Sequence, residues 1–185
     1  DLISLQLLKE PLEKTAEAYI SEEKGVASVK EAIDGARDIL AERISEEASY
    51  RDYIRRLTAE EGMITSEAKD ESAESVYEMY YHFEEPVKKC AGHRILALNR
   101  GEKEKILTVK LLAPEEKILS YLEKRVLQRE NPITSPILKE AAEDVYHRLM
   151  APAIEREIRG SLTEKAEDGA IRVFGKNLEQ LLMQP

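Results

Sequence analysis

The chain has 185 residues, of which 35% are charged and 5% aromatic, and its formal net charge at pH 7 is −9. This composition is typical of a mainly α-helical protein, because charged residues coat helix faces whereas aromatic and β-branched runs build sheets. The longest apolar run, residues 95–98, is too short to span a membrane, so we expect no membrane partner. The single cysteine, Cys90, excludes an internal disulfide framework and predicts a reducing, cytoplasmic location. Asp1 in place of an initiator methionine indicates an excised fragment.

The first third of the chain predicts amphipathic helices. The first helix contains Pro11, which either kinks it or begins a second helix. Ser28 and Glu31 have the spacing of a capping box, so another helix should begin there. After a turn near residues 45–48, a further helix ends at Gly62. This order resembles a helix-turn-helix pair, a pattern that plain helical bundles also show.

The middle of the chain predicts two short strands within a helical setting. Residues 105–111 alternate between apolar and polar side chains, and their expected partner is a short strand at residues 63–65. A short helix over 76–81 and a loop over 82–86 separate the first strand from a helix over 87–101, which ends at Gly101. The expected sheet is therefore at most one small β hairpin. Two more helices follow, the first opening at Pro114.

The end of the chain predicts a long helix, which we call the spine. Its apolar residues recur every four positions, which overshoots a helical turn by about 40° each time, so the stripe winds around the axis. A helix of about 35 residues is about 50 Å long, so it should meet different partners along its length. We expect a helical bundle over residues 1–150 and the spine over 151–185, with a break at Gly160 left open. The apolar residues are Met150, Ile154, Ile158, Leu162, Ala166, Ala170, Phe174, Leu178 and Leu182.

The motifs that usually mark enzymes are missing from the sequence. Residues 169–176 resemble a phosphate-binding loop but have five residues between the glycines where four are needed. Neither a nucleophile elbow nor a dinucleotide fingerprint occurs. Cys90 and His93, three residues apart, could belong to a metal site, but a small buried Cys and a surface His explain them more simply. We therefore expect that the protein is not an enzyme and that it binds no cofactor and no metal.

Charge is spread unevenly along the chain, and only the middle is basic. Residues 1–85 hold 22 acids against 10 bases, residues 86–113 hold 2 against 7, and residues 114–185 hold 13 against 11. The basic side chains of the middle segment could neutralise nucleic-acid phosphates, or they could cap helix carbonyls and pair with the acidic first half. The candidates for nucleic-acid contact are Lys88, Lys89, His93, Arg94, Arg100, Lys103, Lys105 and Lys110.

Several stretches carry a family resemblance. HRILALNRGEKE (93–104) and the stretch over 144–184, with GARDILAERISEEA (35–48) and EEPVKK (84–89), resemble the Tex family of bacterial transcription accessory proteins. The match covers nearly the whole chain in order. Lys105 departs from the pattern, because a Gly is expected after RGEKE.

The resemblance implies a multidomain protein that binds RNA or DNA and acts in transcription, with RNA polymerase as a further candidate partner. Its helical N-terminal region would include a helix-turn-helix module, and the spine would lead to a ribonuclease-H-like domain without catalytic acids. Phe174, Leu178 and Leu182 would then pack on the remaining domains of the same chain and should be exposed here. The alternative is a helical protein–protein interaction module that does not bind nucleic acid directly.

Overall fold

The computed structural model describes residues 1–183 and divides into two compact units. Unit 1 comprises Asp1–Ile54 and Glu115–Ala153, and unit 2 comprises Arg55–Pro114 and the chain from Ile154 onward. Each unit combines two separate stretches of chain, and the predicted domain boundary at residue 150 stays a prediction. The predicted mainly α-helical class is confirmed.

The regular elements of unit 1 are helices, apart from an isolated β-bridge between Ser21 and Val26. The small core of the unit contains Ile3, Leu8, Leu40 and Leu138. The predicted cap at Ser28 is present, because the Ser28 hydroxyl accepts a hydrogen bond of 3.2 Å from the Glu31 backbone N–H. The elements of the unit are α1 (Leu12–Glu17), η1 (Glu22–Lys24), α2 (Val29–Glu46), the first half of α3 (Ala48–Glu61), α5 (Glu115–Val126), α6 (Thr134–Val145) and the π-helical turn η4 (Tyr146–Met150).

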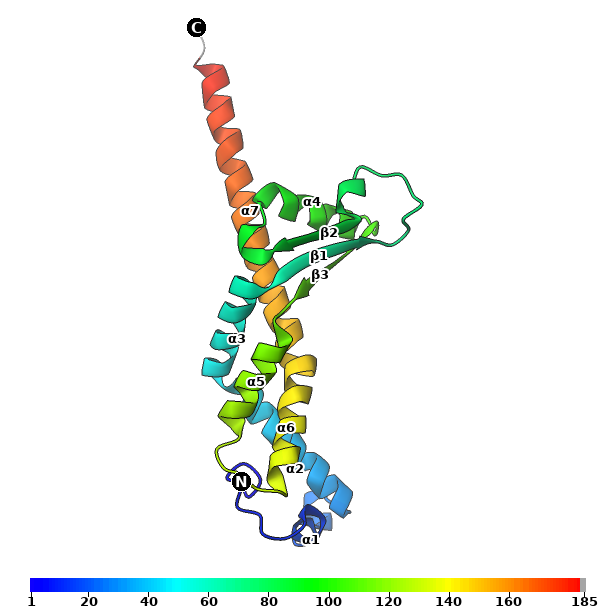
Figure 1. Ribbon diagram of the computed structural model, residues 1–185, viewed down its shortest axis with the longest axis vertical. Helices are drawn as coiled ribbons and strands as arrows, with labels where there is room; N and C mark the ends of the chain where they lie inside the picture. The colour runs from blue at the N-terminus through cyan, green and yellow to red at the C-terminus, as the bar shows by residue number, and fades with distance from the viewer. Residues whose placement is uncertain (184–185) are drawn as a thin grey trace. The chain divides into compact units, whose positions relative to one another are not determined.

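Unit 2 holds a small sheet, one helix packed on it, and most of the spine (Figure 1). Its core joins Ile64 and Val109 of the sheet to Ile95 and Leu98 of α4 and to Ala166 of the spine. Its elements are the end of α3, β1 (Met63–Ala68), η2 (Glu78–Tyr80), β2 (His82–Pro86), η3 (Val87–Lys89), α4 (Gly92–Lys103), β3 (Leu107–Leu112) and α7 (Ala151–Leu182).

The sheet has three antiparallel strands in the order β2-β1-β3. The predicted pairing of the two middle segments is confirmed, with Met63 opposite Leu112 and Ala68 opposite Leu107. The third strand corrects the prediction of a loop at residues 82–86 and enlarges the expected hairpin. Its sequence, HFEEP, has a single large apolar side chain, so the alternation that marks a half-buried strand is too weak to detect.

The helix predicted over 87–101 has different limits in the structure. Residues 87–89 form the 3₁₀ turn η3, Cys90 and Ala91 are extended, and α4 runs from Gly92 to Lys103. Gly101 does not end the helix. A Cβ at that position would lie 2.6 Å from Cδ1 of Leu107, so Gly101 is required for close packing of α4 on β3.

The spine is the continuous helix α7, which the structure leaves unbroken at Gly160. Ile154, Ile158 and Ala166 are buried, whereas every described residue from Glu167 to Met183 is exposed. Within unit 2, the second half of α7 therefore extends past α4 and the sheet (Figure 1).

Candidate nucleic-acid interface and the docking of α7

The eight predicted nucleic-acid residues all lie in unit 2, but they occupy several different elements. Lys88 and Lys89 are exposed on η3, and Lys105 follows the end of α4. His93, Arg100 and Lys103 lie on α4 at spacings of seven and three residues, which places these exposed side chains on one face of the helix. Arg94 and Lys110 have other surroundings.

Arg94 is committed to a contact within the unit. Its Nη1 donates a hydrogen bond of 2.6 Å to Oε1 of Glu85, near the end of β2. This hydrogen bond lowers the pKa of the Glu85 carboxyl from its usual 4.5, and the same contact raises the pKa of Arg94. The ion pair joins the first turn of α4 to the sheet, so the role that the structure indicates for Arg94 is structural.

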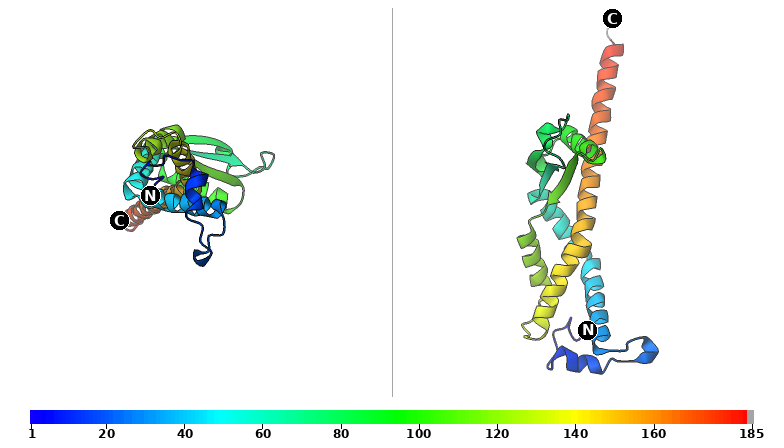
Figure 2. Two further views of the ribbon diagram at one scale, coloured as in Figure 1. Left: turned by 90° about the horizontal axis from the view of Figure 1, so that it is seen from below. Right: turned by 90° about the vertical axis from the view of Figure 1, so that its right-hand side faces the viewer.

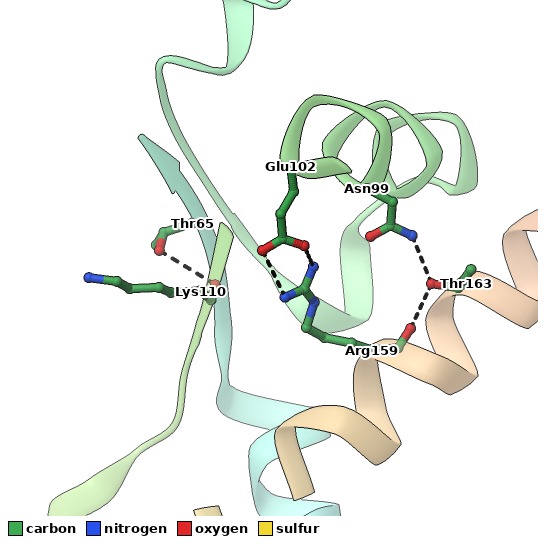
Figure 3. Close-up of polar contacts among 6 residues, drawn as sticks. All are labelled: Thr65, Asn99, Glu102, Lys110, Arg159 and Thr163. Carbon is green, nitrogen blue, oxygen red and sulfur yellow. Dashed lines mark hydrogen bonds and ion pairs between the residues drawn. The ribbon is translucent and has the colours of Figure 1, made fainter. Parts of the chain in front are cut away.

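Lys110 is separated from the other basic residues by the sheet. Leu107 and Val109 of β3 point into the core, so Lys110 points to the opposite face. It pairs across the sheet with Thr65 of β1, and the Thr65 hydroxyl lies 3.5 Å from the Lys110 carbonyl oxygen. Figure 3 shows the Lys110 side chain pointing away from α4 and α7. The sequence segment therefore does not form one continuous basic surface.

Lys165, which the sequence analysis did not single out, lines a groove together with Lys88 of η3. A groove of about 550 Å³ in unit 2 is lined by Lys88 and by Lys165 of α7, with Val87, Ile158 and Leu162 among its apolar walls. Lys165 is 77 positions away in sequence and lies outside the basic segment. No local pattern could have linked it to Lys88, because only the packing of α7 brings the two together.

Lys105 has a backbone conformation that favours glycine. Its φ is 61°, the left-handed region in which a side chain costs about 1 kcal/mol. The Lys105 N–H donates to the Glu102 carbonyl at 3.0 Å, and the Ile106 N–H donates to the Gly101 carbonyl at 2.9 Å. These two bonds form a Schellman motif that ends α4. The Gly expected here from the family resemblance therefore has a structural reason.

Three contacts attach α7 to α4, and the sequence analysis anticipated none of them. Arg159 of α7 binds both carboxylate oxygens of Glu102, and Asn99 Nδ2 donates to Thr163 Oγ1 at 2.8 Å (Figure 3). At the other end of α4, a Cβ on Gly92 would lie 3.2 Å from the Ala166 Cα, so the two helices approach closely there. These contacts hold the first half of α7 firmly within unit 2.

Cys90 lines the same groove as Gly92 of α4 and Ala166 of α7, and its thiol is unreactive. Burial, followed by the nearby Glu85 carboxylate, raises the pKa of Cys90 to about 12. The thiolate that metals and electrophiles require is therefore rare at neutral pH. Across residues 1–183, no three His, Cys, Asp or Glu side chains are grouped so that they could hold a metal ion.

The three side chains predicted to pack on other domains are exposed. Phe174 is 69%, Leu178 44% and Leu182 75% accessible to solvent. This agrees with the expected exposure, while their packing on another domain stays a prediction. Among the helices of the described part of the chain, none has both the length and the apolar character needed to cross a bilayer.

In unit 2, α4 and a small antiparallel sheet share one core, and α4 contacts the long helix α7. The chain belongs to the Tex central region-like family, whose model matches residues 9–174. The predicted resemblance is thus confirmed.

Several relatives align over nearly the whole chain. It is 50% identical over 177 residues to YdcI of Bacillus subtilis, covering 94% of this chain and 25% of that protein. It is 32% identical over 183 residues to protein tex of Bordetella pertussis, covering 91% and 23%. It is 31% identical over 192 residues to the human S1 RNA-binding domain-containing protein 1, covering 96% and 19%. The chain spans a quarter or less of the length of these relatives.

Proposed function

We propose that these residues are the structural scaffold of a Tex-type transcription accessory protein that associates with nucleic acid. The family match over residues 9–174 carries this proposal. Two relatives support it by name, the transcriptional accessory protein Tex of Neisseria gonorrhoeae and the human S1 RNA-binding domain-containing protein 1. In this proposal the role is non-enzymatic and consists in positioning other domains.

The scaffold would act through α7. Its first half is held by the bidentate Arg159–Glu102 contact and by the close approach of Gly92 and Ala166. A helix anchored in this way projects its second half at a defined angle from the sheet and α4. The exposed Phe174, Leu178 and Leu182 would then pack against the remaining domains of the same polypeptide.

Direct contact with RNA or DNA would come from the lysines at the groove of unit 2. Lys88 and Lys165 line this groove and Lys89 is the exposed neighbour of Lys88, so the three form the cluster that we call the groove lysines. Arg100 and Lys103 on α4 form a second basic set. Lysine and arginine bind phosphates without reading sequence, so this contact would be non-specific and sensitive to salt.

Charge reversal tests the nucleic-acid contact. We expect the chain to bind a labelled RNA or DNA duplex at low salt and to lose affinity as salt is raised. The triple variant Lys88→Glu, Lys89→Glu, Lys165→Glu should lose most of this binding and flatten the salt dependence. Lys110→Glu is the control, because it reverses an exposed lysine on the opposite face of the sheet.

The alternative function is a helical protein–protein interaction module, with RNA polymerase as a candidate partner. The exposed apolar side chains of α7 favour it, because contiguous exposed apolar surface marks interaction sites. Absence of binding to either nucleic acid at low salt would contradict a direct role for unit 2 and favour this alternative. Equal loss of binding in the Lys110→Glu control would contradict the assignment to the groove lysines.

A further inference from the structure

The groove of unit 2 has apolar walls that a contact with nucleic-acid phosphates does not use. It is lined by residues of α7, of the start of α4, of η3 and of the end of α3. Figure 2 shows α7 running past α4 within this unit. The walls include Ala59, Ile95, Ile158 and Leu162. Among the residues that the structure describes, no aromatic side chain lines the groove, so it offers no stacking surface for a base.

The charges at the groove leave an excess of two lysines. The charged residues that line it are Arg55, Lys88, Glu157 and Lys165. Arg55 and Glu157 form an ion pair at 3.4 Å, so their charges offset each other. Within the part of the chain that the structure describes, neither Lys88 nor Lys165 has a hydrogen bond or an ion pair. Two unpaired positive charges therefore lie beside apolar walls.

The wall that α7 contributes is long enough for a stretch of polypeptide. It runs from Glu157 to Ala166, which is about 14 Å of helix. A small-molecule site needs several convergent polar groups that fix the orientation of its ligand. Apart from the charged residues, the polar side chain at the walls is that of Ser161, which is exposed. The groove is therefore better suited to a row of apolar side chains than to a small polar ligand.

The two lysines select the charge of such a stretch. Lysine carries a compact charge on a flexible stem, so Lys88 and Lys165 can each follow a carboxylate without a fixed geometry. A basic segment would be repelled by both, because the nearest acid that lines the groove, Glu157, is already paired with Arg55. An occupant with apolar side chains and carboxylates matches both the walls and the charge.

We propose that the groove of unit 2 binds a short acidic segment of a partner protein. Its apolar side chains cover the walls, and its Asp or Glu carboxylates pair with Lys88 and Lys165. This is recognition of an apolar segment in a groove, with opposite charge setting its position. The inference goes beyond the proposed contact with RNA or DNA, and it implies that the segment and nucleic acid compete for the same lysines.

The test uses a synthetic peptide of about 12 residues, which is about 18 Å long as a helix. It carries Leu on one face, Glu on the flank and a single Trp, and it is titrated in the absence of nucleic acid. Because the chain has no Trp, the fluorescence of the peptide reports binding without interference. We expect saturable binding. Peptides with Lys in place of Glu, or with Ser in place of Leu, should each bind at least about tenfold more weakly, a difference of about 1.4 kcal/mol.

Ser161→Leu tests the walls without changing any charge. Ser161 is exposed on α7 and lines the groove, so the larger side chain takes up groove volume, and Leu favours a helix more than Ser does. Peptide binding should fall at least about tenfold, while binding of an RNA or DNA duplex at low salt stays unchanged. Ser120→Leu is the matched control, because Ser120 is an exposed helical serine of α5 in unit 1.

Lys88→Gln with Lys165→Gln tests the charges. This double variant should lose at least about tenfold in affinity for the acidic peptide. Lys176→Gln is the control, since Lys176 is an exposed lysine of the distal part of α7 that does not line the groove. A duplex that displaces the bound peptide from the unmodified chain supports competition for the two lysines.

Three outcomes would overturn the proposal. The first is equal peptide binding to the Ser161→Leu and Ser120→Leu variants. The second is equal affinity for the acidic peptides with Leu and with Ser, which would show that the lysines attract any polyanion, nucleic acid included. The third is binding to this chain but none to full-length YdcI of Bacillus subtilis, which would show that another segment of the polypeptide covers the groove.

Discussion

The two halves of α7 have the same apolar spacing and opposite environments. In the docked half, residues 154–166, Ile154, Ile158 and Ala166 are buried within unit 2. In the distal half, residues 167–182, Phe174 and its neighbours along the stripe are exposed (Figure 1). A pattern of apolar residues thus shows where a helix can be covered, and the neighbouring elements decide where it is covered.

The largest expected difference between the halves is the cost of truncating an isoleucine. Ile158→Ala should destabilise unit 2 by about 2–4 kcal/mol, because it leaves a cavity at a side chain that is 6% exposed. Ile171→Ala, at a side chain that is 69% exposed, should change stability by less than about 0.5 kcal/mol. The rate of Cys90 alkylation in rising urea measures the unfolding of unit 2 specifically, since Cys90 is the only cysteine. Equal effects of the two substitutions would contradict the comparison.

Glycine substitutions should have opposite signs in the two halves. Gly92→Val should cost about 1–3 kcal/mol, because its Cβ would press on the backbone of Ala166 in the docked half. Gly169→Ala meets open space in the distal half and should stabilise α7 by about 0.5–1 kcal/mol. Urea unfolding followed by circular dichroism distinguishes the two. A neutral Gly92→Val variant would show that α4 and α7 do not pack closely.

The end of α4 offers a smaller, stabilising change. Lys105→Gly should raise stability by about 1 kcal/mol, because glycine adopts the left-handed conformation of this residue without strain. Lys103→Gly, at the last helical residue of α4, should instead lower stability, by less than about 1 kcal/mol. The same Cys90 labelling experiment detects both shifts. A destabilised Lys105→Gly variant would contradict the Schellman geometry.

The smallest expected effect is a pH dependence of the sheet–α4 corner. The pKa of Glu85 is lowered in the folded state, chiefly by the hydrogen bond from Arg94, so the contribution of this pair is present above pH 4.5 and is lost as the pH falls further. The effect should be modest because the Arg94 side chain is 42% exposed to solvent. Glu85→Gln should flatten the fall in stability between pH 5 and pH 3 relative to Glu84→Gln, whose carboxylate is exposed. Identical acid profiles would contradict the assignment.

The sequence predicted the fold class well and the candidate site only in part. Helical spacing and the Ser28 cap were sufficient to predict α2. The alternation of apolar and polar residues was sufficient to predict the pairing of β1 with β3. β2 was missed because HFEEP has too few apolar residues to show alternation. Of the basic residues, Arg94 is used within the fold and Lys110 lies on the far face of the sheet. A linear charge count cannot separate these positions.

What the sequence determined by itself is local: the helical class, the family, the long spine and its winding apolar stripe. These follow from short-range spacing, which each segment carries without its neighbours. Only the tertiary structure decided which half of α7 is buried and which basic side chains are exposed. It also decided that Lys165 and Lys88 line the same groove. Such pairings join residues far apart in the chain, and they depend on packing contacts such as Gly92 against Ala166 that no single segment encodes.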